Sequence, residues 1–423
     1  MAWPPSSSPS GPGTSMRRRC TTGFEPAPPH SDKLATTMKP AVLASLLLAA
    51  SLFPQARKFT LPPPNPAGQV ANGAKVVPQP AGKNLTVPAG FTAVEYAGGF
   101  QKPRDMLQLP GGAILVTESV AKGGVFIVNN DKDRKPLISG LDRPFGMAFH
   151  DGYLYVSEAE AINRYKLDPA ALTAGPVEKI VDLKGYGKGH WTRSIAVDAK
   201  AKKLYVSVGS GSNVDLGDPP NRNAVNVYNL DGSSPEIFAT GLRNPVTIRF
   251  QPESKKLWAT VQERDGLGDE IVPDFFTEVK KGAFYGWPYA YIGPNEEPRH
   301  KGVSPEAVKK TIEPDVLLGA HVSAMSFAFY TGKSFPAKYR NGAFIALRGS
   351  SGRSKRVGYS LLFQAFKGGK PVGALEPFLT GFMLGEDVKE VWGRPVGVVQ
   401  LADGSLLLSE DGNNKIWRVS YKK

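Results

Sequence analysis

The sequence is poor in the residues that crosslink small domains or span membranes. It contains one cysteine, Cys20, among 423 residues, and a single cysteine cannot form a disulfide within its own chain. The longest uncharged apolar run, residues 41–53, has 13 residues, and a membrane-spanning helix needs about 20. Histidine is also scarce, with five copies, so few side chains can act as bases near neutral pH. We expect a fold held by its core and no stable membrane insertion.

A nucleic-acid-binding motif is missing as well, although the formal net charge is +14. The lysines are scattered through segments such as "DAKAKK" and "YKK", without interleaved aromatic residues. A basic surface of that kind is typical of a solvated face rather than of a nucleic-acid interface. We therefore expect no nucleic-acid partner.

The N-terminal region differs from the rest of the chain. Residues 1–37 are rich in Pro and Ser and show no apolar period, whereas "MKPAVLASLLLAASLFPQA" has a lysine followed by an apolar core. That pattern is typical of a signal peptide and indicates export to a periplasm or to the outside. We interpret residues 1–37 as untranslated or disordered, 38–56 as the signal peptide and 57–90 as a Pro/Gly-rich arm. A buried helix is the alternative for 38–56.

The chain as a whole is rich in glycine (46) and proline (37), and its remainder repeats itself six times. Each unit has a short apolar strand, a turn and a second strand such as "LYVS", and most add a third and a fourth strand. Six such units predict an all-β fold, a six-bladed β-propeller over residues 91–423. The chain ends on a third strand, so residues 91–100 are expected to complete the last blade and close the ring. Two β-sandwiches are the alternative, but they leave that last strand unexplained.

Cationic residues precede the first strand of nearly every unit. In a propeller these positions converge on the central channel, so we expect a site for an anionic ligand there. The alternative is that each arginine pairs with a carboxylate of a neighbouring blade. The positions are Lys102, Arg104 and Asp105; Arg143; His190 and Arg193; Arg243 and Asn244; His321; and Arg394.

Loops after the second strands should open on the same face. "RGSSGRS" supplies Arg348 and Arg353, and "QERDGLGDE" (262–270) places several oxygen-bearing side chains on a bent loop, which suits Ca²⁺. A salt-bridged loop is the alternative for that segment. His190, in the glycine-rich "YGKGHWTRS", is the candidate base.

Several of these segments together resemble a known enzyme family. "GLRNPVTIRF", "ERDGLGDE" with "GAFYGWPYAYIG", "GHWTRSIAVD" and "WGRPVGVVQLADGSLLLSEDGNNKIWRVSY" are similar to the sorbosone and soluble aldose sugar dehydrogenases, which use pyrroloquinoline quinone (PQQ). The resemblance covers about residues 85–423. It implies a propeller enzyme that oxidises a sugar or related aldehyde by hydride transfer to PQQ and passes the electrons to an acceptor.

The resemblance also assigns roles. It implies that His190 is the general base and that Arg243, Asn244 and Arg394 contact PQQ, while a Ca²⁺ ion is bound at Arg264 and Asp265, largely by main-chain oxygens. We add to it the channel-mouth positions named above. Further cofactor contacts are expected from Arg104, Arg193 and Arg348, and substrate contacts from Asp105, His321 and Arg353.

Some positions depart from the family pattern. Thr247 stands where a glycine is expected, Val246 where glucose-oxidising relatives have a glutamine, and Ser351 and Gly352 where many relatives have a tryptophan and an asparagine. These differences leave the substrate open. Two other functions remain as alternatives, a Ca²⁺-dependent lactonase-like hydrolase and a non-catalytic ligand-binding propeller.

Overall fold

The computed structural model describes residues 58–68, 70–128 and 134–422. The segments interpreted above as untranslated (1–37) and as a signal peptide (38–56) lie outside these residues. Within the described part, no helix is both long enough and apolar enough to cross a membrane.

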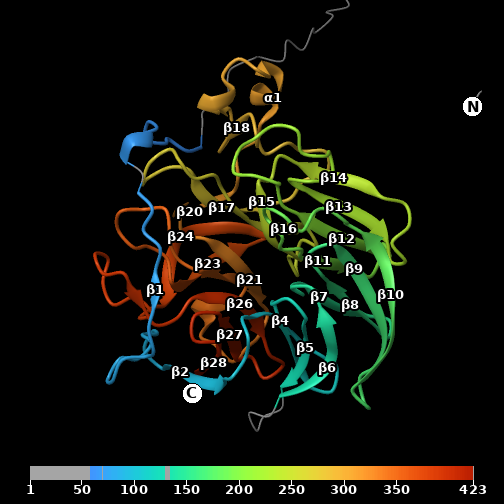
Figure 1. Cartoon of the computed structure of the whole chain (residues 1–423). Helices are drawn as coiled ribbons and strands as arrows, with labels where there is room; N and C mark the ends of the chain where they lie inside the picture. The colour runs from blue at the N-terminus through green and yellow to red at the C-terminus, as the bar shows by residue number, and fades with distance from the viewer. Residues whose placement is uncertain (1–57, 69, 129–133, 423) are drawn as a thin grey trace, which may run out of the picture. The chain divides into compact units, whose positions relative to one another are not determined.

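Six four-stranded antiparallel sheets form the body of the fold (Figure 1). Blade 1 contains β3 (Pro103–Gln108), β4 (Ile114–Glu118), β5 (Gly123–Val128) and β6 (Arg134–Leu141). Blade 2 contains β7 (Met147–His150), β8 (Tyr153–Ser157), β9 (Ala161–Asp168) and β10 (Thr173–Asp182). Blade 3 contains β11 (Ile195–Asp198), β12 (Lys203–Val208), β13 (Ala224–Asn229) and β14 (Glu236–Thr240).

The other three blades complete the set. Blade 4 contains β15 (Asn244–Phe250), β16 (Leu257–Gln262), β17 (Pro273–Glu278) and β20 (Val316–Ala320). Blade 5 contains β21 (Ala324–Tyr330), β22 (Gly342–Leu347), β23 (Ser360–Lys367) and β24 (Lys370–Leu379). Blade 6 contains β26 (Pro395–Gln400), β27 (Leu406–Glu410), β28 (Lys415–Tyr421) and β2 (Phe91–Ala97).

The sheets form a ring because their first strands contact one another in sequence. β3, β7, β11, β15, β21 and β26 each contact the next, and β26 contacts β3. The prediction of an all-β six-bladed propeller is therefore confirmed. In blade 6 the order is β2-β28-β27-β26, and Phe91 lies opposite Tyr421 in the register of β2 and β28.

The local sequence explains how these strands form. Between β7 and β8, Asp151 and Gly152 take positive φ angles of 49° and 75°, as the central residues of a type I′ hairpin turn must. Second strands such as β8 are largely buried, because they are covered by neighbouring blades on both faces. Apolar clusters fill the gaps between sheets, and Phe145, Val246, Met325 and Val396 form a small cluster from four different blades. This cluster is the apolar floor beneath the channel mouth.

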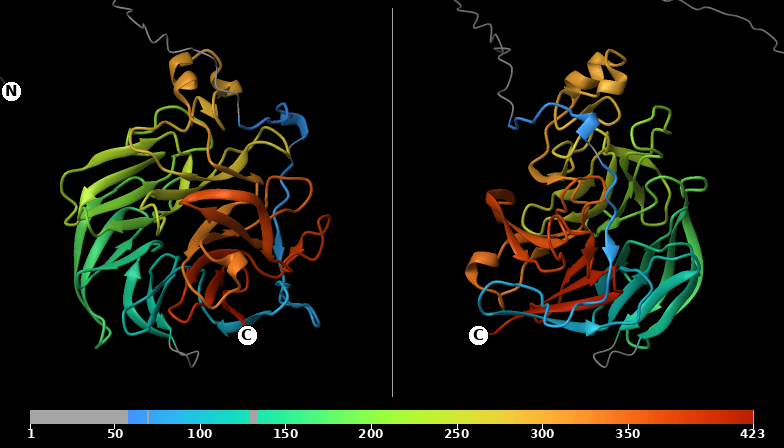
Figure 2. Two further views of the ribbon diagram at one scale, coloured as in Figure 1. Left: turned by 180° about the vertical axis from the view of Figure 1, so that it is seen from behind. Right: turned by 60° about the vertical axis from the view of Figure 1, so that its left-hand side comes forward.

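Two additions surround the ring. Between β17 and β20 an insertion carries β18 (Ala290–Tyr291), β19 (Asn295–Glu296), the short helix η2 (Pro298–His300) and α1 (Pro305–Lys310), and it stands out from the sheets (Figure 2). The described part of the N-terminal arm contains η1 (Pro66–Gly68) and β1 (Lys75–Val76), and β1 pairs in parallel with β25 (Glu390–Val391). One further short helix, η3 (Ala337–Tyr339), precedes β22.

Candidate functional site

Two adjoining cavities lie where the segments before the first strands meet the loops after the second strands. The first, of about 140 Å³, is lined by His190, Arg243, Gln262, Glu263, Asp265, Asp274, His321, Ser323, Ser351 and Gly352. The second, of about 190 Å³, is lined by Arg104, Gly189, His190, Trp191, Thr192, Asn244, Val246, Gln262, Ser323, Met325 and Arg348. His190, Gln262 and Ser323 line both cavities, so His190 lies at their junction.

The hydrogen bonds of His190 fix its tautomer. Nδ1 lies 3.0 Å from the main-chain oxygen of Ser210, which can only accept, so Nδ1 carries the proton and Nε2 keeps its lone pair. Burial and the nearby charge of Arg243 lower the pKa of His190 to about 3. The imidazole is therefore neutral at physiological pH. Within the described part of the chain, Nε2 has no hydrogen-bond partner and remains free to accept a proton.

A second cation supports this arrangement. The guanidinium of Arg222 donates from Nη2 to the same Ser210 oxygen at 2.9 Å and from Nε to the oxygen of Gly209 at 3.0 Å. Because Arg222 also donates to the oxygen of Lys188 at 2.9 Å, it joins the segment before His190 to the loop that receives the imidazole. The His190 side chain is thus held by two loops of blade 3.

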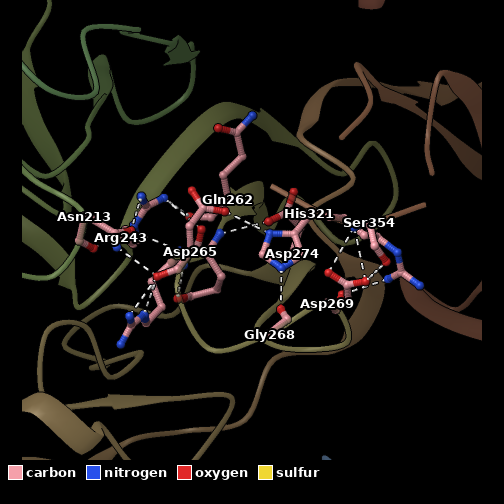
Figure 3. Close-up of polar contacts among 12 residues, drawn as sticks. Asn213, Arg243, Gln262, Asp265, Gly268, Asp269, Asp274, His321 and Ser354 are labelled. Carbon is pink, nitrogen blue, oxygen red and sulfur yellow. Dashed lines mark hydrogen bonds and ion pairs between the residues drawn. The ribbon is translucent and has the colours of Figure 1, made fainter. Parts of the chain in front are cut away.

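Arg243 lines the first cavity, but the main chain uses most of its donors. Nε and Nη2 donate to Asn213, to its main-chain and side-chain oxygens, each at 2.9 Å, and Nη1 donates to the oxygen of Glu263 at 2.9 Å. Asn213 also accepts from the N–H of Asp265 (Figure 3). The structure therefore makes Arg243 a buried positive charge beside His190, tied to Asn213, rather than a free fork for an anion.

The wall between the two cavities has polar atoms that lack partners. Asn244 donates from Nδ2 to Oε1 of Gln262 at 3.0 Å, while its own Oδ1 is buried without a partner among the described residues. Thr192 Oγ1 and Arg104 Nε are likewise buried without a hydrogen-bond partner among the described residues. Since unpaired buried polar atoms are costly, these atoms mark the second cavity as the place for a polar ligand.

Three guanidinium groups share one carboxylate beside that cavity. Asp411, which is fully buried, binds Arg104 Nη2 at 2.6 Å and Arg348 Nε at 2.9 Å. Arg394 lies close enough to both that its charge helps to lower the pKa of Arg104, after burial, to about 10. The cluster therefore has an excess of positive charge. Arg104 and Arg348 line the second cavity, whereas Arg394 lies beside them and donates to the oxygens of Arg348 and Gly349.

Buried carboxyl groups line the first cavity on the opposite side. Burial raises the pKa of Glu263 from 4.5 to about 8 and that of Asp274 from 3.8 to about 7. Asp274 accepts from the N–H groups of Glu263 at 2.9 Å and Ala324 at 2.8 Å. Glu263 Oε1 has no partner among the described residues. At neutral pH, Glu263 is mainly a neutral acid.

His321 closes this side of the cavity. Its Nδ1 lies 2.8 Å from Asp265 Oδ1 and its Nε2 lies 2.8 Å from the oxygen of Gly268 (Figure 3). Burial alone would lower the pKa of His321, but these two oxygen partners raise it above its ordinary value. His321 is therefore a hydrogen-bond donor at both ring nitrogens and does not compete with His190 as a base.

Of the oxygen atoms expected to bind Ca²⁺, those of Asp265 already accept hydrogen bonds. The main-chain oxygen of Asp265 accepts from Asn213 Nδ2 at 2.9 Å and from Arg264 Nε and Nη2 at 2.9 and 2.7 Å, and the Arg264 side chain also pairs with buried Glu297. Over the described ranges, no group of three or more His, Asp, Glu or Cys side chains could hold a metal ion. These contacts involve the Asp265 oxygens, and binding of Ca²⁺ by main-chain oxygens at Arg264 and Asp265 stays a prediction.

Three other predicted site residues lie outside both cavities. Arg193 is fully buried and donates to the main-chain oxygens of Tyr186, His190 and Thr192 at 2.5, 2.7 and 2.8 Å. Asp105 points into the ring and pairs with Arg249 of blade 4 at 2.8 Å. Arg353 turns away to Asp269 and Glu270. None of the three lines either cavity. Arg193 acts on the site through the backbone of His190.

Sequence reasoning missed Asn213, Ser323 and Asp274 as site residues, and it considered Gln262 only as part of the 262–270 loop expected to suit Ca²⁺. Asn213 stands in the glycine-rich "GSGSNVD" loop after a second strand, a position that marks the same face as the other loops. Asp274 belongs to β17, a third strand, and nothing in its sequence context signals that its carboxyl reaches the channel.

Comparisons of the sequence with known proteins find one matching family and two relatives. The TrAA12-like family matches residues 85–273. An uncharacterised protein of Borreliella burgdorferi is 33% identical over 360 residues, which span 80% of this chain and 91% of that protein. The aldose sugar dehydrogenase YliI of Escherichia coli is 33% identical over 127 residues, 29% of this chain and 31% of the enzyme.

Among solved structures, the holo form of the PQQ domain of pyranose dehydrogenase from Coprinopsis cinerea is similar with a TM-score of 0.69 and 19% identity. The match covers 81% of this chain and 98% of that domain. At that level of identity the likeness is one of fold.

Proposed function

We propose that this chain, which belongs to the same family as the uncharacterised protein of Borreliella burgdorferi, is an oxidoreductase that oxidises a sugar or a related aldehyde or alcohol with PQQ. The observation that carries the proposal is the free Nε2 of neutral His190 at the edge of an arginine-rich cavity. The likeness to a PQQ domain and to an aldose sugar dehydrogenase supports it.

The residues of the second cavity fit PQQ, a flat quinone with three carboxylates. Among the described residues, Arg104 and Arg348 share the single carboxylate of Asp411, and Arg394 adds a third positive charge beside them; guanidinium groups bind carboxylates well. The unpaired atoms of Thr192 and Asn244 would meet polar atoms of the ring system. When bound, PQQ supplies the acceptor for a hydride from the substrate C–H.

His190 performs the proton chemistry. Its Nε2 accepts the proton of the substrate hydroxyl while the C–H bond breaks and the C=O bond forms. The Ser210 oxygen keeps Nδ1–H in place throughout, so the ring does not rotate as it becomes charged. A bound carboxylate nearby would raise the pKa of His190 from its low ligand-free value. A higher pKa would make the imidazole a stronger general base.

The first cavity is the place for the substrate. It offers neutral Glu263, the His321–Asp265 pair and the small wall residues Ser351 and Gly352, so it suits a polar molecule with several hydroxyl groups. Sorbosone and aldoses both fit that description, and the electron acceptor after PQQ remains an unnamed small molecule or protein. Export through residues 38–56 remains a prediction. Calcium binding at Arg264 and Asp265 likewise remains a prediction, and we give Ca²⁺ no step.

Reconstitution tests the proposal. Purified protein is titrated with PQQ in the presence and absence of Ca²⁺, and binding is followed by the quinone absorbance and by the melting temperature. Dye reduction is then measured with aldoses, sorbosone and simple alcohols. We expect PQQ binding and oxidation of at least one polyhydroxylated substrate.

A matched pair of variants assigns the base. His190→Gln should retain PQQ binding and lose about 10²- to 10⁴-fold in kcat. His150→Gln, which changes the same residue type in β7, lines neither cavity and should behave as the wild type. Absence of PQQ binding would refute the proposal. Lactone hydrolysis without PQQ would favour the hydrolase alternative, for which the described residues offer no carboxylate-rich metal cluster.

A further inference from the structure

The N-terminal arm, residues 58–68 and 70–90, crosses the loops that form one side of the site. It is drawn in blue in Figure 1, beside blades 5 and 6. Asn65 donates from its main-chain N–H to the oxygen of Leu267 at 2.7 Å, in the blade 4 loop. The main-chain N–H of Val77 donates at 2.9 Å to the oxygen of Val391, which lies just before blade 6. The main-chain oxygen of Val77 accepts at 2.8 Å from Nδ2 of Asn413, which lies within blade 6. The arm therefore links three blades.

Between these two anchors, Asn72 binds the blade 5 loop with every polar group it has. Its main-chain N–H donates to the oxygen of Ser351 at 2.8 Å. Its Nδ2 donates to the oxygens of Arg353 and Ser354 at 3.1 and 2.8 Å. Its Oδ1 and main-chain oxygen accept from Arg356 Nη2 at 2.6 and 2.8 Å. Asn72 thus bonds to this loop through both its main chain and its side chain.

The loop needs that support because residues 351–354 lie between β22 and β23 and belong to neither strand. Ser351 and Gly352 nevertheless line the first cavity. Their side chains are too small to anchor themselves by packing, and Ser351 is exposed. The segment is also held on its other side by Asp269 and Glu270. Arg353 Nη1 donates to the Asp269 oxygen at 2.8 Å and Nη2 to the Glu270 carboxylate at 2.5 Å, and the Ser354 N–H donates to the Asp269 carboxylate at 3.1 Å. The arm therefore supplies the bonds on one side of the wall, and the blade 4 loop supplies those on the other.

We propose that Asn72 is a positioning residue for the active site, which holds the Ser351–Gly352 wall where it contacts the substrate. The inference rests on the proposed function for its kinetic consequence. Asn72 itself does not line either cavity, and it contacts neither His190 nor Ser210, which are held within blade 3. Losing it should therefore weaken substrate binding and leave proton transfer unchanged.

Three variants of the full chain separate positioning from folding. Asn72→Ala removes both side-chain donors and the acceptor. Asn72→Asp keeps the acceptor for Arg356 and loses only the donors to Arg353 and Ser354. Asn84→Ala makes the same chemical change at an exposed position of the arm and is the matched control.

The first readout needs no cofactor. Trypsin cuts after Arg353 and Lys355 are followed by mass spectrometry in the ligand-free protein. Because local opening follows the hydrogen bonds that are lost, both Asn72 variants should be cut about tenfold faster than wild type and Asn84→Ala. Equal cutting rates would overturn the positioning role, whether or not the protein proves to be a PQQ enzyme.

The second readout is kinetic, with PQQ-loaded protein and the best substrate found for the wild type. The Asn72 variants should raise KM about tenfold and leave kcat and its pH profile unchanged. A purely structural role would reduce the active fraction, so kcat would fall at constant KM, and that result would overturn the inference. A wild type that oxidises no substrate would refute the proposed function alone, and the trypsin result would then decide the role of Asn72.

Discussion

Replacing Glu263 with glutamine should stabilise the protein, and increasingly so as the pH rises. The Glu263 side chain is buried, its Oε1 has no partner among the described residues, and Oε2 accepts only a 3.2 Å bond from the N–H of Arg264. Burial raises its pKa from 4.5 to about 8. Glutamine has nearly the shape of the protonated acid but cannot ionise, so it mimics the folded form at neutral pH.

The magnitude follows from proton binding. Between about pH 5 and pH 8 the folded protein keeps the proton of Glu263 while the unfolded chain releases it, so the free energy of unfolding falls by about 1.4 kcal/mol per pH unit. The glutamine variant lacks this loss. From pH 5.5 to pH 7.5 its advantage over the wild type should therefore grow by about 3 kcal/mol. Asp274, with its raised pKa, contributes a loss of the same sign to both proteins and does not cancel the difference.

Urea denaturation of the cofactor-free protein at pH 5.5, 6.5 and 7.5, followed by tryptophan fluorescence, measures this difference. Glu306→Gln, an identical change on the exposed face of α1, provides the control, and its difference from the wild type should stay nearly constant over this range. If the advantage of Glu263→Gln were also constant, or if it shrank with rising pH, Glu263 would be ionised in the folded state and the reasoning would be wrong.

Other consequences can be tested on the same preparation. Asp411→Asn leaves two guanidinium groups without their counter-charge and should lower the free energy of unfolding by about 3–5 kcal/mol. The control Asp403→Asn removes the charge of a half-exposed pair with Arg418 and should lower it by about 1 kcal/mol or less. Equal effects of the two variants on urea denaturation would contradict the buried network. The ring protons of His190 should show no titration between pH 5 and 8 in NMR spectra of the ligand-free protein, because burial lowers its pKa to about 3; a midpoint near the ordinary value of 6.5 would contradict this. Gly209→Ala would place a Cβ 2.5 Å from the Cβ of His190 and 2.7 Å from Oδ1 of Asn244, so kcat should fall at least about tenfold. In the control Gly175→Ala, the new Cβ would lie 3.4 Å from its nearest atom, and kcat should not change.

The architecture was predictable because its signals are local. Hairpins such as the one at Asp151 and Gly152 are determined by adjacent residues, and their repetition gives the number of blades. Placing His190 at the channel mouth required only the knowledge that first strands converge on the axis. Its tautomer and its low pKa were not predictable, since they depend on Ser210 and Arg243, which come from other loops.

Side-chain direction is where sequence reasoning reached its limit. Arg193 and Arg104 both lie near the start of a first strand and look equivalent in the sequence, yet Arg193 turns inward to three main-chain oxygens and Arg104 turns to Asp411 beside the cavity. The choice depends on which blade supplies a carboxylate, and that is a property of the assembled ring. The same holds for Asn72, whose partners are about 280 residues away in the sequence and give no local pattern.

His190 lies between two surroundings of opposite character, and this arrangement determines what it can do. On one side, Arg104 and Arg348 line a positively charged cavity, while burial, followed by the charges of Arg243 and Arg222, disfavours a proton on the imidazole. On the other side, Glu263 is neutral at pH 7 because of burial, so it neither holds a proton on His190 by attraction nor repels an anion from the neighbouring cavity. A negatively charged ligand would therefore meet no opposing charge from Glu263, and we expect its arrival to raise the pKa of His190. Under the proposed function, ligand binding and base strength are thus coupled through charge.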